Sequence, residues 1–200
     1  MYRIATISDI ADIHRAEEFV LTHHLWGTTY QPQVTGRLAW VEGKGFALRM
    51  TCREENPTRV YTRRDDPVYK DSCMEAFLNF TPDAEKPGYT NFEMNANGAM
   101  LCAVGPDRNH RTPLRELTLE PAGPAVQIGP EGWQLDLFIP LALIQSIYGP
   151  VEIAPGYRVR GNFYKCGDET PSLHYASWAK VGTEHPDFHR PEFFGEMVVE

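Results

Sequence analysis

Acidic side chains stand within an otherwise apolar segment of the sequence, "VYKDSCMEAFLNF", which spans residues 68–80. Aromatic and apolar residues of this kind favour a β-strand. Successive side chains of a strand point to opposite faces, so Asp71 and Glu75 would share one face while Met74 and Leu78 occupy the other. The pattern predicts a strand that seals a core with one face and presents carboxylates on the other.

A second segment, "YTNFEMNANG", repeats this arrangement. Asn91 and Glu93 fall on one face, and Phe92 and Met94 on the other. Two carboxylates on neighbouring strands could hydrolyse a glycosidic bond, which requires them to lie roughly 5 to 9 Å apart across the substrate. Nothing in the sequence predicts a closed, desolvated cleft that would raise one pKa, so binding is favoured over catalysis.

Several residues have the chemistry of a sugar site, in which aromatic rings stack on a pyranose and planar polar groups bind its hydroxyls. The candidate ligand-binding residues are Tyr69, Asp71, Glu75, Asn91, Glu93, Arg160 and Trp178. Each also has a purely structural interpretation. Trp178 could belong to the core, and Asp71 and Glu75 could pair with Arg158 or Arg160 on a neighbouring strand.

Short alternating segments predict most of the remaining elements. Strands are expected around "RLAWV", "FALRMTC", "AMLCAV", "WQLDLFI", "YRVRGNFYKC" and "EFFGEMVVE". A helix capped by Ser8 is expected roughly over residues 9–21, and a second over "PLALIQSIYG", begun by Pro140 and ended by Gly149. The residues expected to be buried are Phe77, Leu78, Phe92, Met94, Trp133, Leu135, Leu137 and Phe163.

These elements predict an all-β protein, a jelly-roll-type antiparallel β-sandwich with one or two short helices. The 16 prolines and 16 glycines are spread along the chain, and no stretch is rich enough in them to be a linker. Residues 1–200 are therefore expected to form a single domain.

The charge pattern bears on partners and compartment. A net charge of −8 with interspersed signs disfavours nucleic acid or an anionic membrane as a partner. The longest apolar runs are too short to span a bilayer. The first residues carry acids where a signal peptide has a basic end, so a cytoplasmic location is the default expectation. The oligomeric state is not predicted.

Metal-binding motifs are weak. Cys52, Cys73, Cys102 and Cys166 form no CxxC pair, so buried free thiols are expected and a zinc site is not. In "HPDFH", residues 185–189, the proline disfavours a helix that would bring both histidines together, and two loop histidines are expected. Oxygen ligands scattered over loops could still bind a calcium ion.

Taken in order, the segments "VYKDSCMEAFL", "YTNFEMNANG", "WQLDLFIPLALI", "RGNFYKCGD", "SWAKV" and "FHRPEFFG" resemble the family 9 carbohydrate-binding modules and their stand-alone relatives. The resemblance covers roughly residues 30–200. It implies a β-sandwich related to DOMON-like domains. It also implies non-catalytic binding of a mono- or oligosaccharide in carbohydrate catabolism, and the modules of xylanases bind the reducing end of the sugar.

The resemblance also implies roles for particular residues. Tyr69 and Trp178 match the two aromatic residues that clamp a sugar, and Glu75 matches the acid that binds its hydroxyls. The modules use an arginine after this strand, and here Thr90 stands near its place. Xylanase modules carry structural calcium, whose ligands do not map onto this chain.

Two alternatives stay open beside sugar binding. One is a DOMON-type haem or redox domain with axial ligands among Met50, Met94 and His174. The other is a glycan-processing enzyme that uses Glu75 and Glu93.

Overall fold

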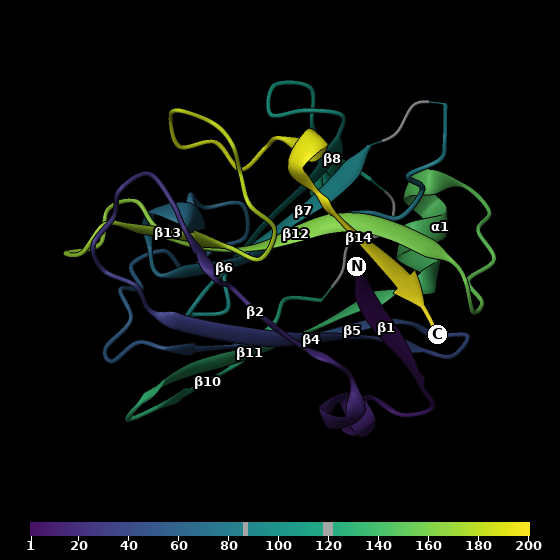
Figure 1. The fold of residues 1–200 in the computed structure, drawn as a ribbon, viewed down its shortest axis with the longest axis horizontal. Helices are drawn as coiled ribbons and strands as arrows, with labels where there is room; N and C mark the ends of the chain where they lie inside the picture. The colour runs from purple at the N-terminus through teal and green to yellow at the C-terminus, as the bar shows by residue number, and fades with distance from the viewer. Residues whose placement is uncertain (86–87, 118–121) are drawn as a thin grey trace.

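β-Strands form two layers that enclose the core (Figure 1). The computed structural model describes residues 1–85, 88–117 and 122–200. The first layer contains, in spatial order, β14 (Gly195–Val199), β12 (Arg158–Gly167), β6 (Cys73–Asn79), β7 (Tyr89–Asn95), β8 (Met100–Gly105) and β9 (Thr112–Pro113). In the same layer, β13 (His174–Ser177) pairs with β12 and with β3 (His23–His24).

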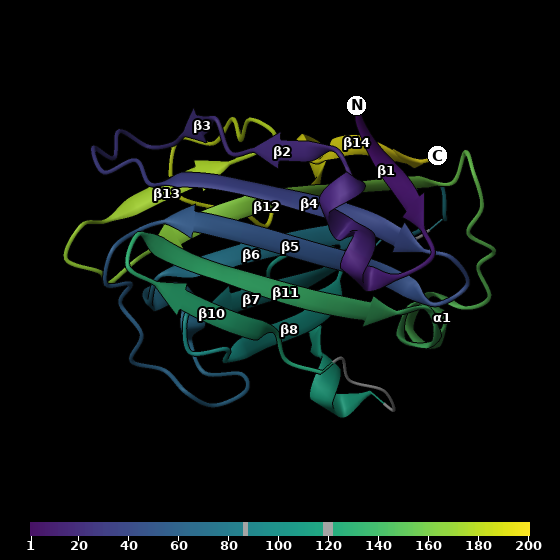
Figure 2. The ribbon, with the colours of Figure 1, turned by 90° about the horizontal axis from the view of Figure 1, so that it is seen from below.

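The second layer contains, in spatial order, β10 (Ala125–Gly129), β11 (Gly132–Pro140), β5 (Gly45–Arg53) and β4 (Gln33–Val41), with β2 (Glu18–Val20) beside β4 (Figure 2). β1 (Tyr2–Ile7) joins the layers because its first half pairs with β14 and its second half with β4. Both of these pairings are parallel, whereas the other strand pairs are antiparallel. The predicted β-sandwich is confirmed, with β1 as its departure from an antiparallel arrangement.

The core between the layers follows the predicted alternation. Met74 and Leu78 of β6 and Phe92 and Met94 of β7 pack against residues of the opposite layer in one hydrophobic cluster. All eight residues expected to be buried are at most 2% exposed, which confirms the predicted strand register.

The outer face of β6, β7 and β12 is covered as well. Every residue of β6 and of β7 is buried, although the sequence predicts a polar outer face open to solvent. Loops from the C-terminal third pass over this face (Figure 1), and Phe77, Tyr164 and Phe188 form part of a second cluster beneath them. Any ligand site on this face is therefore a pocket rather than an open groove.

The expected N-terminal helix is wrong. Residues Ile10–Arg15 form a short 3-10 helix capped by Asp9 rather than Ser8, and the chain then continues as β2. Ile13 and Ala16 are buried at a helical spacing. Phe19 and Leu21, by contrast, are buried at the alternate spacing of a strand, because β2 and the residue after it pair with β4.

Other local predictions are confirmed or adjusted. The second helix is α1 (Leu141–Tyr148), with Pro140 as its N-cap and Gly149 at φ 82° as its C-cap. Tyr69 lies in a 3-10 turn, Val68–Lys70, just before β6 rather than in that strand. Of the described helices, none combines the length and apolar character needed to cross a membrane.

Candidate functional site

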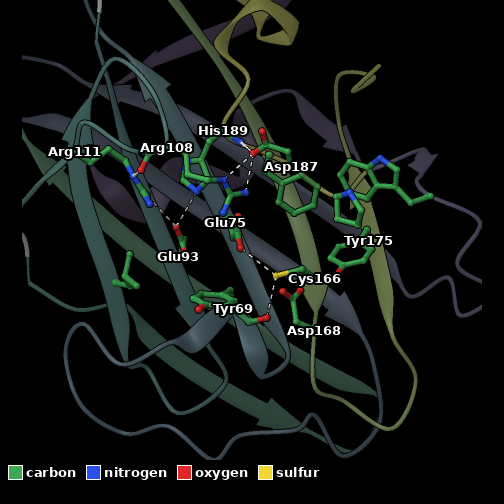
Figure 3. A pocket seen from close by; sticks show the side chains of 14 residues that line it. Tyr69, Glu75, Glu93, Arg108, Arg111, Cys166, Asp168, Tyr175, Asp187 and His189 are labelled. Atoms are coloured by element: carbon green, nitrogen blue, oxygen red, sulfur yellow. Dashed lines mark hydrogen bonds and ion pairs between the residues drawn. The ribbon is translucent and has the colours of Figure 1, made fainter. Parts of the chain in front are cut away.

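A pocket of about 250 Å³ opens on the outer face of the first layer (Figure 3). Strands β6, β7 and β12 supply its floor, and loops supply most of its walls, together with Leu101 of β8 and Tyr175 of β13. Its lining combines acidic, basic and aromatic side chains: Trp26, Tyr69, Glu75, Glu93, Leu101, Arg108, Arg111, Cys166, Asp168, Tyr175, Pro186, Asp187, Phe188 and His189.

Glu75 and Glu93 lie side by side on the floor, because they are directly opposite each other in the β6–β7 register. Both are buried. Burial raises the pKa of Glu93 to about 7, against the opposing effect of Arg111 and Arg108. Burial and the neighbouring Glu93 raise the pKa of Glu75 well above its ordinary value. Desolvation and the mutual repulsion of their charges therefore favour the protonated form of this pair of carboxyls.

A polar network orients Glu93. The Asn91 amide donates to Glu93 Oε1 at 3.0 Å, and Arg111 Nη1 donates to Asn91 Oδ1 at 3.0 Å while lying 3.7 Å from the same carboxylate oxygen. His189 Nε2 lies 3.8 Å from Glu93 Oε1, and its Nδ1 is 2.8 Å from the Tyr89 hydroxyl.

His189 is held as a neutral ring. Burial lowers its pKa well below the ordinary value, and the nearby arginines lower it further. Because the Tyr89 hydroxyl is the natural donor to Nδ1, we assign the ring proton to Nε2, which faces Glu93. Tyr89 thus sets the tautomer that His189 presents to the pocket.

The basic wall comes from the loop between β8 and β9. Arg108 binds Asp187 through Nε at 3.1 Å and Nη2 at 2.7 Å. This pair links that loop to the segment between β13 and β14 on the other side of the pocket. Arg108 and Arg111 therefore supply guanidinium groups to the site. The family modules use an arginine there, and the resemblance placed only Thr90 near its position.

The aromatic wall is built around Trp26. Its φ of 53° lies in the left-handed region, which is unusual for a bulky residue, and Gly27 follows at φ 70°. Its Nε1 donates to the Thr183 carbonyl at 3.0 Å, and its ring packs edge-on against Tyr175 at 5.1 Å. A strained backbone that holds a large ring at a pocket wall is typical of a functional site.

Three of the predicted residues line this pocket, namely Tyr69, Glu75 and Glu93. Asn91 supports it through Glu93. Asp71 is buried outside the pocket, where one carboxylate oxygen accepts hydrogen bonds from the Val60 and Tyr61 amides and from Asn95. Its contacts fix a loop.

Arg160 and Trp178 lie elsewhere. Arg160 pairs with Glu196 at 3.0 Å and donates to the Phe194 carbonyl. Trp178 packs edge-on against Phe163 at 5.9 Å, on the core side of β12. The expected gap between facing Tyr69 and Trp178 rings is therefore not formed. In the described part of the chain, Arg158 pairs with Asp83 and Glu196, and Arg160 pairs with Glu196. The alternative in which these arginines pair with Asp71 or Glu75 is therefore wrong.

The candidate haem ligands do not converge. Met50 and Met94 are fully buried in the core between the layers. His174 is engaged at both ring nitrogens, by Lys165 Nζ at 2.5 Å and by the Ser172 carbonyl at 2.6 Å. The arrangement leaves no imidazole nitrogen of His174 for an axial bond.

Most of the walls were missed from the sequence. Trp26, Arg108, Arg111 and Tyr175 lie in loops or at a short strand, where no periodic pattern marks them. His189 lies in a loop, as expected, but its side chain is buried at the pocket. The detectable hint was the clustering of charge and aromatic residues in "PDRNHR" and "HPDFHR".

Comparison with known proteins places the chain in a family. The model of carbohydrate-binding family 9 matches residues 6–199, and the chain belongs to that family. No curated protein sequence matches it.

Solved structures share the fold. A candidate carbohydrate-binding protein from Bacteroides uniformis ATCC 8492 is 26% identical, with a TM-score of 0.81 over 99% of this chain and 98% of the other. A family 9 module from Caldicellulosiruptor kristjanssonii, solved with cellotriose, has a TM-score of 0.66 at 12% identity, over 100% of this chain and 93% of the other. The same organism's module solved with glucose has a TM-score of 0.64 at 12% identity, over 99% and 95%.

Proposed function

We propose that this protein binds the end of a neutral mono- or oligosaccharide in the pocket floored by Glu75 and Glu93, without catalysis, as one carbohydrate-binding unit over residues 1–200. Family membership supports carbohydrate as the ligand class. The observation that supports this location is that aromatic rings, two neighbouring carboxyls and two guanidinium groups line the same pocket.

The two kinds of lining group have separate tasks. Trp26, Tyr69 and Tyr175 offer apolar surface to the C–H faces of a sugar ring. Glu75 and Glu93 accept hydrogen bonds from its hydroxyls, and Arg108 and Arg111 donate to its oxygens. The aromatic partner of Tyr69 in this proposal is Trp26 or Tyr175 rather than Trp178.

A chain end suits the pocket better than the middle of a chain. The floor is closed by buried strand residues, and the Arg108–Asp187 pair joins two of the walls. A polysaccharide that continued in both directions would have to cross these walls. Structural relatives were solved with glucose and with cellotriose, so β-linked glucose units are the first ligands to test.

The position of the carboxyls favours binding over hydrolysis. Glycosidases place two carboxylates on either side of the scissile bond. Here both glutamates project from the same floor, on adjacent strands (Figure 3).

Isothermal titration calorimetry with glucose, cellobiose, cellotriose and xylose tests the proposal. We expect binding of at least one of these sugars. Trp26→Ala should weaken it at least about tenfold, because a stacked aromatic side chain contributes roughly 1.5–3 kcal/mol. Glu75→Ala should weaken it as well, since it removes the carboxyl oxygens from the pocket floor.

The matched control is Trp178→Ala, which removes the same side chain from outside the pocket and should leave the affinity unchanged. Loss of binding in Trp178→Ala with normal binding in Trp26→Ala would place the site elsewhere. Release of glucose from cellotriose by the wild type, abolished in Glu75→Gln, would show that the protein is an enzyme.

A further inference from the structure

Two cysteines that are 93 residues apart in the sequence meet beneath the pocket. Cys73 of β6 and Cys166 of β12 are directly opposite in the strand register. Glu75 lies on the same face of β6 as Cys73, and Cys166 Sγ is 3.1 Å from Glu75 Oε1. One donor atom from each of the three residues lies within 4.8 Å of the others. We propose that Cys73, Cys166 and Glu75 bind a thiophilic divalent cation of the Zn²⁺ class.

The spacing fits such a cation after small side-chain adjustments. Zinc–sulfur and zinc–oxygen bonds of about 2.3 and 2.1 Å in a tetrahedron put neighbouring donors roughly 3.5 to 4 Å apart. Cys166 Sγ and Glu75 Oε1 must separate slightly, and any donor separation near the 4.8 Å limit must shorten by at most about 1 Å. Side-chain rotation can supply these changes, while the paired strands hold the backbone fixed.

Charge balance also suits the cluster. Burial raises the pKa of Cys73 to about 12 and that of Cys166 well above its ordinary value, so both thiols are protonated without a cation. Binding replaces the two S–H protons, and the Glu75 proton where present, with one doubly charged ion. The three anionic ligands then leave one negative charge, and the nearby Arg108 offsets it.

The pocket gives the cation a way in. Cys166 and Glu75 both line it, and Asp168 lies beside them (Figure 3). Three protein ligands leave a fourth coordination position on the pocket side, as in zinc sites that bind water or substrate. No sequence motif marks this site, because its cysteines come from different strands rather than from a CxxC pair. The proposal does not depend on sugar binding.

Cobalt titration in the absence of sugar tests it. The full chain is reduced, treated with a chelator, desalted, and shown by thiol titration in denaturant to carry four thiols. One equivalent of Co²⁺ should then produce a thiolate charge-transfer band in the near ultraviolet, and one equivalent of Zn²⁺ should abolish it. Binding should release about two to three protons per cation into a weakly buffered indicator solution.

Variants assign the ligands. Cys73→Ser and Cys166→Ser should each remove the charge-transfer band and weaken Zn²⁺ binding more than about 100-fold. Loss of a residue that only orients a metal ligand weakens metal affinity about 10- to 100-fold, and loss of the ligand itself should weaken it more. Cys102→Ala, which removes a buried cysteine of β8, is the matched control and should bind like the wild type.

Two results would overturn the proposal. One is the absence of a stoichiometric thiolate band in the fully reduced wild type. The other is a band that survives in a folded Cys73→Ser/Cys166→Ser variant, with folding judged by circular dichroism.

Discussion

The stabilisation that the buried glutamates contribute should be lost as the pH rises through neutrality. A carboxyl whose pKa is raised in the folded state binds its proton more tightly there than in the unfolded chain. The resulting stabilisation is present at low pH and is lost as the pH rises through the folded pKa. For Glu93 that pKa is about 7, and Glu75 shifts in the same direction.

Comparison of the wild type with Glu93→Gln isolates the contribution of Glu93 between about pH 6.5 and 8. With a folded pKa of about 7, Glu93 should lose about 0.8 kcal/mol of stabilisation across this window. His174 and His189 oppose this loss, because their lowered folded pKa values mean that the unfolded chain binds protons that the folded protein does not. Both histidines are about half protonated in the unfolded chain at pH 6.5, so each should add about 0.4 kcal/mol of stability by pH 8.

Urea unfolding monitored by tryptophan fluorescence at several pH values measures the loss. Glu93→Gln removes the loss assigned to Glu93, so its stability should rise by about 0.8 kcal/mol relative to that of the wild type between pH 6.5 and 8. The matched control Glu42→Gln, which changes an exposed residue in the β4–β5 turn, should reproduce the wild-type slope. A Glu93→Gln variant whose stability follows the same pH dependence as the wild type would refute the reasoning.

Three further predictions concern stability. Asp71→Ala should cost about 2–4 kcal/mol in urea unfolding, because one buried and two partly buried donors lose the same carboxylate oxygen. Lys165→Met should cost about 3–5 kcal/mol, because it leaves Glu54, which lies 3.3 Å from Lys165 Nζ, buried without its cation. The double variant Lys165→Met/Glu54→Gln should recover part of the lost stability, and equal losses in the single and double variants would contradict this explanation. Trp178→Ala should cost about 3 kcal/mol through lost packing, and a melting temperature equal to the wild type would show that its ring contributes little to the core.

The layered core could be predicted from sequence because strand periodicity is a local property. Alternation over "WQLDLFI" and "NFEMN" is sufficient to choose the buried face, and the hydrophobic effect enforces that choice. The same logic placed Glu75 and Glu93 together on one outer face, as the register confirms. It erred near residues 9–21, where apolar spacing fitted a helix but pairing with β4 favoured a strand.

The pocket walls could not be predicted in the same way. Loop conformation depends on contacts between distant segments, such as Trp26 with Thr183 and Arg108 with Asp187. No periodicity records these contacts. The assignment of Trp178 to a sugar clamp failed for a related reason. The order of motifs identifies the family, but tertiary structure decides on which face of β12 the Trp178 ring packs.

Hydrogen bonding separates the structural acids from the candidate ligand-binding acids on this face. Asp71 and Glu75 are both buried and only four residues apart. Asp71 has three strong donors, which fully account for its burial. In the described part of the chain, the donor to Glu75 is the Cys166 thiol, a weak one. A carboxyl that is buried at a pocket floor with so little compensation retains acceptor capacity for a partner from outside the chain. This difference points to Glu75, rather than Asp71, as the acid that meets a ligand.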